Sequence, residues 1–337
     1  MSQDTLSDVL RTVRLRGAIF YHVNGSRSWA AEAPPAREVA GAVMPESEHV
    51  MEYHVVTRGS CWGAIVGEAP VRLECGDIIL FPHGDAHVIS SAPGMRAQAN
   101  VAGLSERIDQ LPFTLNLDAV EGNSDMRSDD GYETGLVCGF LGCDLRPFNP
   151  LIDTLPRLLH LTPKGGQDWI THFMHQAVAE SRSKRPGGEA MLERMSEMMF
   201  VDAVRRYVEM LPEDSRGWLA GLRDRFVGRA LALMHDDPAT EWTVEELGDR
   251  IGLSRSALHE RFVEMIGLPP MQYLLNWRMQ VAATLLRNTN ATVSSIAMEV
   301  GYASEAAFSR AFKRLAGQPP ATWRRQKIQG EQATHGR

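Results

Sequence analysis

The chain has 337 residues, of which 44% are apolar and 23% are charged, the balance of a globular protein with room for two or more domains. No apolar run approaches the roughly 18 residues of a transmembrane span, and the first residues lack the apolar stretch of a secretory signal, so we expect neither membrane association nor export. Four cysteines are too few for a disulfide scaffold in a chain of this length, which favours the reducing cytoplasm.

The net charge is −7, but the charges are unevenly distributed. Residues 240–325 contain ten Lys and Arg against eight Asp and Glu, whereas the rest of the chain contains 25 against 34. Affinity for nucleic acid depends on local phosphate contacts rather than on the charge of the whole chain. The composition therefore permits nucleic-acid binding near the end of the chain.

Residues 15–145 have the pattern of a β-rich domain. Short apolar runs follow one another there, separated by Gly, Pro and Asp turns: Val50–Thr57, Cys61–Val66 and Asp77–Phe81. This spacing predicts a β-sandwich or a small barrel. We expect loops at Ala31–Arg37 and Glu121–Gly131.

One stretch of this domain has an informative spacing. From Gly76 to His87 the sequence GDIILFPHGDAH follows the pattern G-x5-P-x-G-x2-H. A strand enters after the Gly-Asp turn, Pro-x-Gly reverses it, and His87 points inward from the next strand. Upstream, the stretch EYHVVTRG runs from Glu52 to Gly59. The two stretches resemble the second and the first motif of the cupin barrel.

The cupin resemblance leaves two alternatives open for the histidines. Cupins that hold a metal usually have a His-x-His pair before the motif glutamate, and this chain has Glu46 and Glu48 there. A divalent metal needs three or four well-placed donors, and the candidates are Glu52, His54, His83 and His87. Alternatively, the barrel has no cofactor, and its histidines are hydrogen-bonded core or turn residues.

Cys138 and Cys143 enclose the hexapeptide CGFLGC. A span of six residues can bring two thiols together across a turn, so one interpretation is a redox switch or a metal clip. The other interpretation is a pair of free buried cysteines, which are common in proteins.

Residues 149–215 change to a helical pattern. Apolar residues recur at helical spacing along Trp169–Ala177 and along Leu192–Leu211, with the sequence SRSKRPGG between the two predicted helices. The apolar stripe of the second helix either packs against the core of the chain or forms the interface of a homodimer.

Residues 217–325 are helical throughout and contain an internal repeat. We expect helices near residues 217–235, 243–251, 254–265, 269–287, 292–300, 304–316 and 319–325. The repeated sequences are TVEELGDRIGLS, which begins at Thr243, and TVSSIAMEVGYAS, which begins at Thr292.

Each copy of the repeat has the local signals of a helix, a tight turn and a second helix. It opens with a threonine N-cap, ends its first helix at a glycine suited to a left-handed turn, and starts its second helix with a serine N-cap. These residues are Thr243, Gly252 and Ser254 in the first copy and Thr292, Gly301 and Ser304 in the second. Such a unit can place its second helix in the major groove of DNA.

The second copy continues as GYASEAAFSRAFKRLAGQPPATWRR, which closely resembles the signature of AraC/XylS-type transcriptional regulators. The resemblance covers residues 217–326. It implies a seven-helix domain that reads two adjacent major-groove segments, with the helix at 269–287 as a rigid spacer. In regulators of this type, a cupin-like N-terminal domain usually binds an effector and does not catalyse a reaction.

The second helix of each copy presents polar residues to the DNA. We expect base contacts from Arg255, Ser256, His259 and Glu260 in the first copy, and from Glu305, Ser309 and Arg310 in the second. Arg310 is the leading candidate, because arginine can read guanine O6 and N7 with two hydrogen bonds; the alternative is a surface ion pair. Glu260 either accepts from cytosine or pairs with Arg261. The expected phosphate contacts are Lys313, Arg314 and Arg324.

The sequence thus predicts an α+β multidomain protein, with an N-terminal cupin-like β-barrel followed by an all-α C-terminal domain with two helix-turn-helix motifs. The expected domains are an effector-sensing barrel at 1–148, a helical linker or dimerisation segment at 149–215, the DNA-binding domain at 216–326 and a flexible tail at 327–337. We expect a cytoplasmic transcriptional regulator without catalytic residues, whose partners are double-stranded DNA, RNA polymerase, an effector or oxidant, and a second copy of itself. The alternative is a metal-dependent cupin enzyme with a DNA-binding tail.

Overall fold

The computed structural model describes residues 4–98, 113–117, 132–163, 176–177, 179–180 and 185–325. The chain divides into two compact units, and each unit is assembled from separate stretches. The β unit comprises Leu15–Cys143 and Leu155–Tyr207, and the helical unit comprises Met1–Arg14, Asp144–Thr154 and Val208–Arg337. Among the described residues, no helix is both long and apolar enough to cross a membrane.

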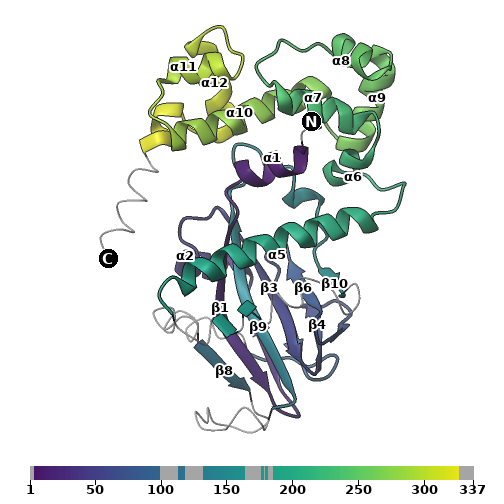
Figure 1. The fold of residues 1–337 in the computed structure, drawn as a ribbon, viewed down its shortest axis with the longest axis vertical. Coiled ribbons are helices and arrows are strands. Elements are labelled where there is room, and N and C mark those ends of the chain that lie inside the picture. Colours follow the sequence, from purple (N-terminus) through teal and green to yellow (C-terminus); the bar gives the residue numbers. More distant parts are fainter. Residues whose placement is uncertain are drawn as a thin grey trace. The chain divides into compact units, whose positions relative to one another are not determined.

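Two sheets form the β unit (Figure 1). The larger sheet has the strand order β10-β6-β3-β9-β1-β8, and the smaller has the order β2-β7-β4-β5. The strands are β1 (Arg16–Gly25), β2 (Ala30–Ala33), β3 (His49–Arg58), β4 (Ser60–Ile65), β5 (Val71–Glu74), β6 (Ile78–Phe81), β7 (His87–Ser90), β8 (Phe113–Leu117), β9 (Thr134–Cys143) and β10 (Leu159–Leu161).

Strand β3 is buried on both faces. Its successive side chains point to opposite sides of the sheet, and each side is covered by a different part of the β unit. Val50 and Val56 belong to the core between the two sheets. Tyr53 faces the other way, and its hydroxyl lies 2.8 Å from the Oγ of Ser196 on the long helix α5 (Gly188–Met210). At Gly17 of β1 an added Cβ would lie 2.5 Å from the Cβ of Ser196, so α5 packs closely over the outer face of the larger sheet (Figure 1).

The predicted β-rich domain is confirmed, and its three apolar runs form β3, β4 and β6. The strands form two sheets, and in the described part of the chain these do not close into the expected barrel. The predicted loop at Ala31–Arg37 is wrong, because β2 runs to Ala33 and α2 (Ala36–Val43) begins three residues later. The predicted loop at Glu121–Gly131 and nearly all of the predicted helix at Trp169–Ala177 lie outside the described residues.

The helical unit follows the predicted pattern, with one correction. Its helices are α1 (Thr5–Thr12), the 3-10 turn η3 (Ile152–Thr154), α6 (Trp218–Arg223), α7 (Val227–Asp236), α8 (Val244–Ile251), α9 (Arg255–Ile266), α10 (Pro270–Asn288), α11 (Val293–Glu299), α12 (Glu305–Ala316) and a last helical turn at 320–325. The predicted single helix at 217–235 is two helices. Asp224 separates them, and its carboxylate accepts hydrogen bonds from the amides of Phe226 and Val227.

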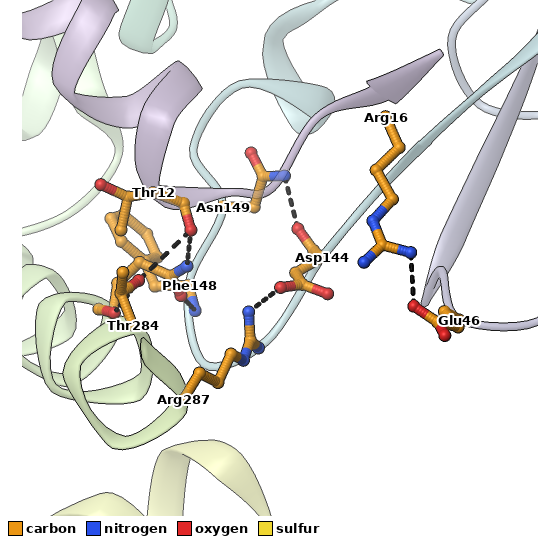
Figure 2. Close-up of polar contacts among 9 residues, drawn as sticks. Thr12, Arg16, Glu46, Asp144, Phe148, Asn149, Thr284 and Arg287 are labelled. Atoms are coloured by element: carbon orange, nitrogen blue, oxygen red, sulfur yellow. Dashed lines mark hydrogen bonds and ion pairs between the residues drawn. The ribbon is translucent and has the colours of Figure 1, made fainter. Parts of the chain in front are cut away.

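Two stretches from the first half of the chain are built into the helical unit (Figure 2). The carbonyl of Thr12, at the end of α1, accepts a hydrogen bond from the Gln280 side chain of α10 over 3.2 Å. The same side chain accepts from the amide of Phe148 over 3.0 Å. Asp144 forms an ion pair with Arg287, and both side chains are at most 4% exposed. Residues 1–14 and 144–154 therefore belong to the helical unit, whereas the predicted segments were 1–148 and 149–215.

Candidate nucleic-acid interface and buried histidine cluster

The first helix-turn-helix consists of α8, a tight turn and α9. The Thr243 hydroxyl accepts from the amide of Glu246, and the Glu246 carboxylate accepts from the amide of Thr243, which completes the expected capping box. Gly252 ends α8 with a φ of 83°. At Gly248 an added Cβ would lie 2.5 Å from the carbonyl oxygen of Leu253, so glycine allows the turn to fold back closely on α8.

The second helix-turn-helix, α11 and α12, repeats this arrangement. The Thr292 hydroxyl accepts from the amide of Ser295 over 3.0 Å, and the Ser304 hydroxyl accepts from the amide of Ala307 over 3.2 Å. Gly301 lies in the turn between them with a φ of 80°. The predicted caps and turn glycines of both copies are therefore confirmed.

Helix α10 packs against both motifs and is the expected spacer between them. Near its start, the ring of Tyr273 contacts Phe262 of α9 with a centroid distance of 5.8 Å. Farther along, α10 contributes to a buried cluster with the second motif, whose members include Met279, Leu286, Ile296, Ala297, Phe308 and Phe312. Because each motif has its own core on one continuous helix, the two second helices are held at a fixed separation within the helical unit.

The expected base-reading residues of α9 are all exposed: Arg255, Ser256, His259 and Glu260. The neighbouring Arg261 does not pair with Glu260. Its guanidinium contacts both carboxylate oxygens of Asp224, with distances between 2.5 and 3.1 Å. This ion pair ties α9 to the start of α7 and leaves Glu260 on the open face.

Helix α12, the second helix of the second motif, also presents its predicted residues at the surface. Glu305, Arg310, Lys313 and Arg314 are exposed, and Ser309 is half-buried. Among the described residues, the Arg310 side chain makes no hydrogen bond or ion pair. Its base contact remains a prediction.

Arg324 has a role within the helical unit that the sequence did not indicate. Its guanidinium donates to the carbonyl of Leu286 over 3.2 Å and to the carbonyl of Ala291 over 2.6 Å. These bonds join the last helical turn to the end of α10. Its expected phosphate contact remains a prediction.

A second candidate site lies between the two sheets of the β unit. Glu52 and His54 project from β3 and His87 from β7, and one ligand atom from each lies within 4.8 Å of the other two. The Nε2 atoms of the two histidines are 2.7 Å apart. The Glu52 carboxylate oxygens lie 4.0 Å from Nε2 of His54 and 3.7 Å from Nε2 of His87. All three side chains are buried, so this arrangement is a compact, water-poor set of metal-ligating groups.

The hydrogen bonds around this histidine cluster determine its proton positions. His87 donates from Nδ1 to the carbonyl of Asp85 over 2.9 Å, which leaves its Nε2 as an acceptor. His54 therefore donates from Nε2, and its Nδ1 accepts from the thiol of Cys138 over 2.8 Å. Every ring nitrogen of the two histidines thus has a partner while both imidazoles are neutral.

Burial sets the ionisation of the cluster. It lowers the pKa of His87 to about 4, and burial together with the neighbouring His87 lowers the pKa of His54 well below its usual value. Burial raises the pKa of Glu52 to about 7, against the opposing effect of a 2.7 Å hydrogen bond from the Tyr21 hydroxyl. Among the described residues, Glu52 thus has a phenol as its hydrogen-bond partner and the imidazoles of His54 and His87 beside it.

Tyr21 and the contact between His54 and Cys138 were not expected from the sequence. Tyr21 lies on β1, and Cys138 lies on β9 directly opposite both Tyr21 and His54 in the strand register. Only the pairing of three strands that are far apart in the sequence brings these residues together. No local motif carries that information.

Two of the expected ligand or redox interpretations need correction. His83 is exposed, and its Nε2 bonds to the carbonyl of Leu155 over 2.9 Å, so it is not a fourth ligand. Cys138 and Cys143 do not meet across a turn, because both lie on the continuous strand β9. Five residues of strand separate their Cα atoms by roughly 16 Å, beyond the roughly 7 Å reach of a disulfide.

The apolar stripe of α5 is part of the β unit's own packing. Met199, Phe200 and Ala203 are fully buried, and Leu192 and Met195 are nearly so. This favours the core-packing interpretation of the stripe over its use as a homodimer interface.

Comparisons with known proteins agree with both halves of the chain. Residues 4–209 match the cupin family, and residues 247–326 match the helix-turn-helix domain family. An AraC-like transcription regulator of Streptomyces lividans is 32% identical over 96% of this chain and 98% of its own length. The HTH-type transcriptional regulator AlkR of Acinetobacter baylyi is 25% identical over 96% and 99%.

A solved structure of the DNA-binding domain of AdpA with a target DNA is 28% identical, with a TM-score of 0.29, and covers 31% of this chain and 92% of that one. Both of the relatives named above are transcriptional regulators. The cupin match spans more than half of the chain, and the Streptomyces relative is similar over nearly its whole length. The chain therefore belongs to the AraC family of transcriptional regulators and has an N-terminal cupin domain.

Proposed function

We propose that this regulator reads two adjacent major-groove segments of a promoter, one with α9 and one with α12. The duplicated motif on a single spacer helix supports this, because two recognition helices about 34 Å apart can enter successive grooves on one face of DNA. Arg310, exposed and without a partner among the described residues, is the side chain we assign to direct base reading.

The β unit then serves as the sensor. Among the described residues, Glu52, His54 and His87 form a buried cluster of ionisable, metal-ligating groups in this unit. We propose that a small effector or an oxidant acts there and alters the affinity of the helical unit for its promoter. Contact with RNA polymerase at that promoter, and action in the cytoplasm, belong to the same proposal.

The DNA-binding proposal is tested by capturing genomic fragments of the source organism with the full-length protein. The salt concentration is about 150 mM, because this weakens binding that depends on phosphate contacts alone. We expect a few promoter fragments to be enriched. Arg310→Ala should weaken specific binding by about 1–3 kcal/mol, or roughly 5- to 150-fold. Arg205→Ala, which removes an equal charge from an exposed position of α5, should not.

Equal losses in the two variants would mean that Arg310 contributes only charge. If the wild-type protein captures no fragment, with or without added metal or oxidant, the proposal fails for this chain.

A homodimer remains a proposal without an assigned surface, since the stripe expected to form it is buried within the β unit. Light scattering of the full-length protein across a range of concentrations measures its mass directly. A mass that stays at one chain throughout would reject the homodimer.

A further inference from the structure

We propose that Glu52, His54 and His87 bind a divalent first-row transition-metal ion, and that this ion is an effector of the β unit. Its regulatory role rests on the proposed function, whereas its binding does not. Two imidazoles and one carboxylate form a donor set that suits zinc or ferrous iron and leaves coordination positions open for a further ligand.

The distances fit such an ion. Zinc bonds to nitrogen and oxygen of about 2.0–2.2 Å place tetrahedral donors roughly 3.3 Å apart. The Glu52 oxygens already lie 3.7 and 4.0 Å from the histidine nitrogens. The two Nε2 atoms, now 2.7 Å apart around a shared proton, would separate by only a fraction of an ångström as the ion replaces that proton.

Each ligand has a supporting hydrogen bond behind it, the arrangement that orients ligands in metal sites. The Asp85 carbonyl holds Nδ1 of His87, and the Tyr21 hydroxyl holds the Glu52 carboxylate. Cys138 holds Nδ1 of His54. When a metal occupies Nε2 of His54, the neutral ring carries its proton on Nδ1, and the sulfur of Cys138 changes from donor to acceptor.

The ligand set differs from the cupin pattern described above. Glu46, which stands at a His-x-His position, is engaged in an ion pair with Arg16. His54, two residues after the motif glutamate on the same face of β3, supplies the second imidazole instead.

The geometry favours an ion over simple packing. Among the described residues, the polar groups that face the Glu52 carboxylate are the Tyr21 hydroxyl, at 2.7 Å, and the Nε2 atoms of His54 and His87, at 4.0 and 3.7 Å. A packing role alone would not require two imidazoles to turn their Nε2 atoms toward each other and toward a carboxyl group.

Direct metal binding tests the proposal on the full-length protein. After dialysis against a chelator, the chain is titrated with Zn²⁺ by calorimetry and with Co²⁺, whose visible spectrum reports nitrogen and oxygen ligands. We expect one ion per chain. Glu52→Gln and His87→Gln should abolish binding, and Cys138→Ala, which removes the hydrogen-bond partner of His54, should weaken it roughly 10- to 100-fold.

His83→Gln is the matched control, since this exposed histidine of the same motif lies outside the cluster, and it should bind normally. Circular dichroism checks that each variant is folded, and the near-isosteric Glu52→Gln and His87→Gln serve as independent tests of one prediction. No binding by the wild type, or unchanged binding in the folded cluster variants, would overturn the proposal. Promoter capture by the chelated protein tests the DNA-binding proposal separately, so the two can fail independently.

Discussion

At the scale of single residues, the ion pair between Arg287 and Asp144 has the largest expected energetic effect. Both side chains are at most 4% exposed, and Asp144 also holds the segment after β9 through its carbonyl, which accepts from Asn149 over 2.7 Å (Figure 2). Arg287→Met keeps the aliphatic part of the side chain but removes the guanidinium that pairs with the buried Asp144 carboxylate. We expect a loss of about 3–5 kcal/mol in unfolding free energy, measured by urea denaturation.

The pair of Arg16 and Glu46 provides the control, and Figure 2 shows both pairs. Its side chains are 43% and 24% exposed, so water already screens the attraction. Arg16→Met should therefore cost less than about 1 kcal/mol. Comparable losses in the two variants would show that burial does not set the strength of these pairs.

His235 gives the helical unit a dependence on pH. Burial lowers the pKa of this histidine to about 3. The Tyr273 hydroxyl, which accepts from Trp218, donates to its Nε2, and the Asp8 carboxylate of α1 lies 4.0 Å from its Nδ1. The unfolded chain binds a proton below a pH of about 6.5 and the native state does not, so stability is lost as the pH falls from about 6.5 toward 3.

The measurement is the difference in unfolding free energy between the wild type and His235→Gln. Relative to His235→Gln, the wild type should lose about 2 kcal/mol of unfolding free energy when the pH is lowered from 7.5 to 5. Asp8, whose pKa is raised by burial, is present in both proteins, so its own contribution to the pH dependence cancels in this difference. His259→Gln, at an exposed position, should follow the wild type at every pH, and a flat difference for His235→Gln would contradict the assignment.

At the scale of elements, the first helix-turn-helix depends on Gly248. An added Cβ would meet the carbonyl oxygen of Leu253 at 2.5 Å, so Gly248→Ala should push the turn and α9 away from α8. We expect a loss of about 1–3 kcal/mol in stability, together with weaker promoter binding. The same substitution at Gly41 in α2, where the space is open, should stabilise by about 0.5–1 kcal/mol. A neutral Gly248→Ala would show that the turn has room to adjust.

The elements that the sequence predicted correctly are those with local signals. The capping box at Thr243 and the glycines at 252 and 301 lie within a few residues of the helices that they end or begin. Strand β10 was missed because three residues give no periodic signal, and it is a strand only by pairing with β6. Tyr21 joined the Glu52 cluster through the register of β1 and β9, which depends on the pairing of distant segments.

At the scale of the whole molecule, the strands that line the histidine cluster continue directly into the helical unit. Strand β1 carries Tyr21 and follows α1 after a short connection, and β9 carries Cys138 and ends at the residue before Asp144. Thr12 precedes β1 in the chain, and Phe148 follows β9. The carbonyl of Thr12 and the amide of Phe148 both bond to the fully buried side chain of Gln280. Gln280 is part of α10, the helix that packs against both helix-turn-helix motifs.

Gln280→Met tests the proposal that an effector in the β unit alters promoter binding by the helical unit. The substitution preserves volume but leaves the Phe148 amide without its partner, and we expect a cost of about 1–3 kcal/mol in stability. We also expect the change in promoter affinity on adding Zn²⁺ to become smaller, because α10 loses its bonds through Gln280 to the end of α1 and to Phe148. Gln272→Met is the matched control, since Gln272 bonds only to Asn276 of the same helix among the described residues. If both variants respond to zinc as the wild type does, the two strands do not carry the signal, even if the metal binds and the promoter is read.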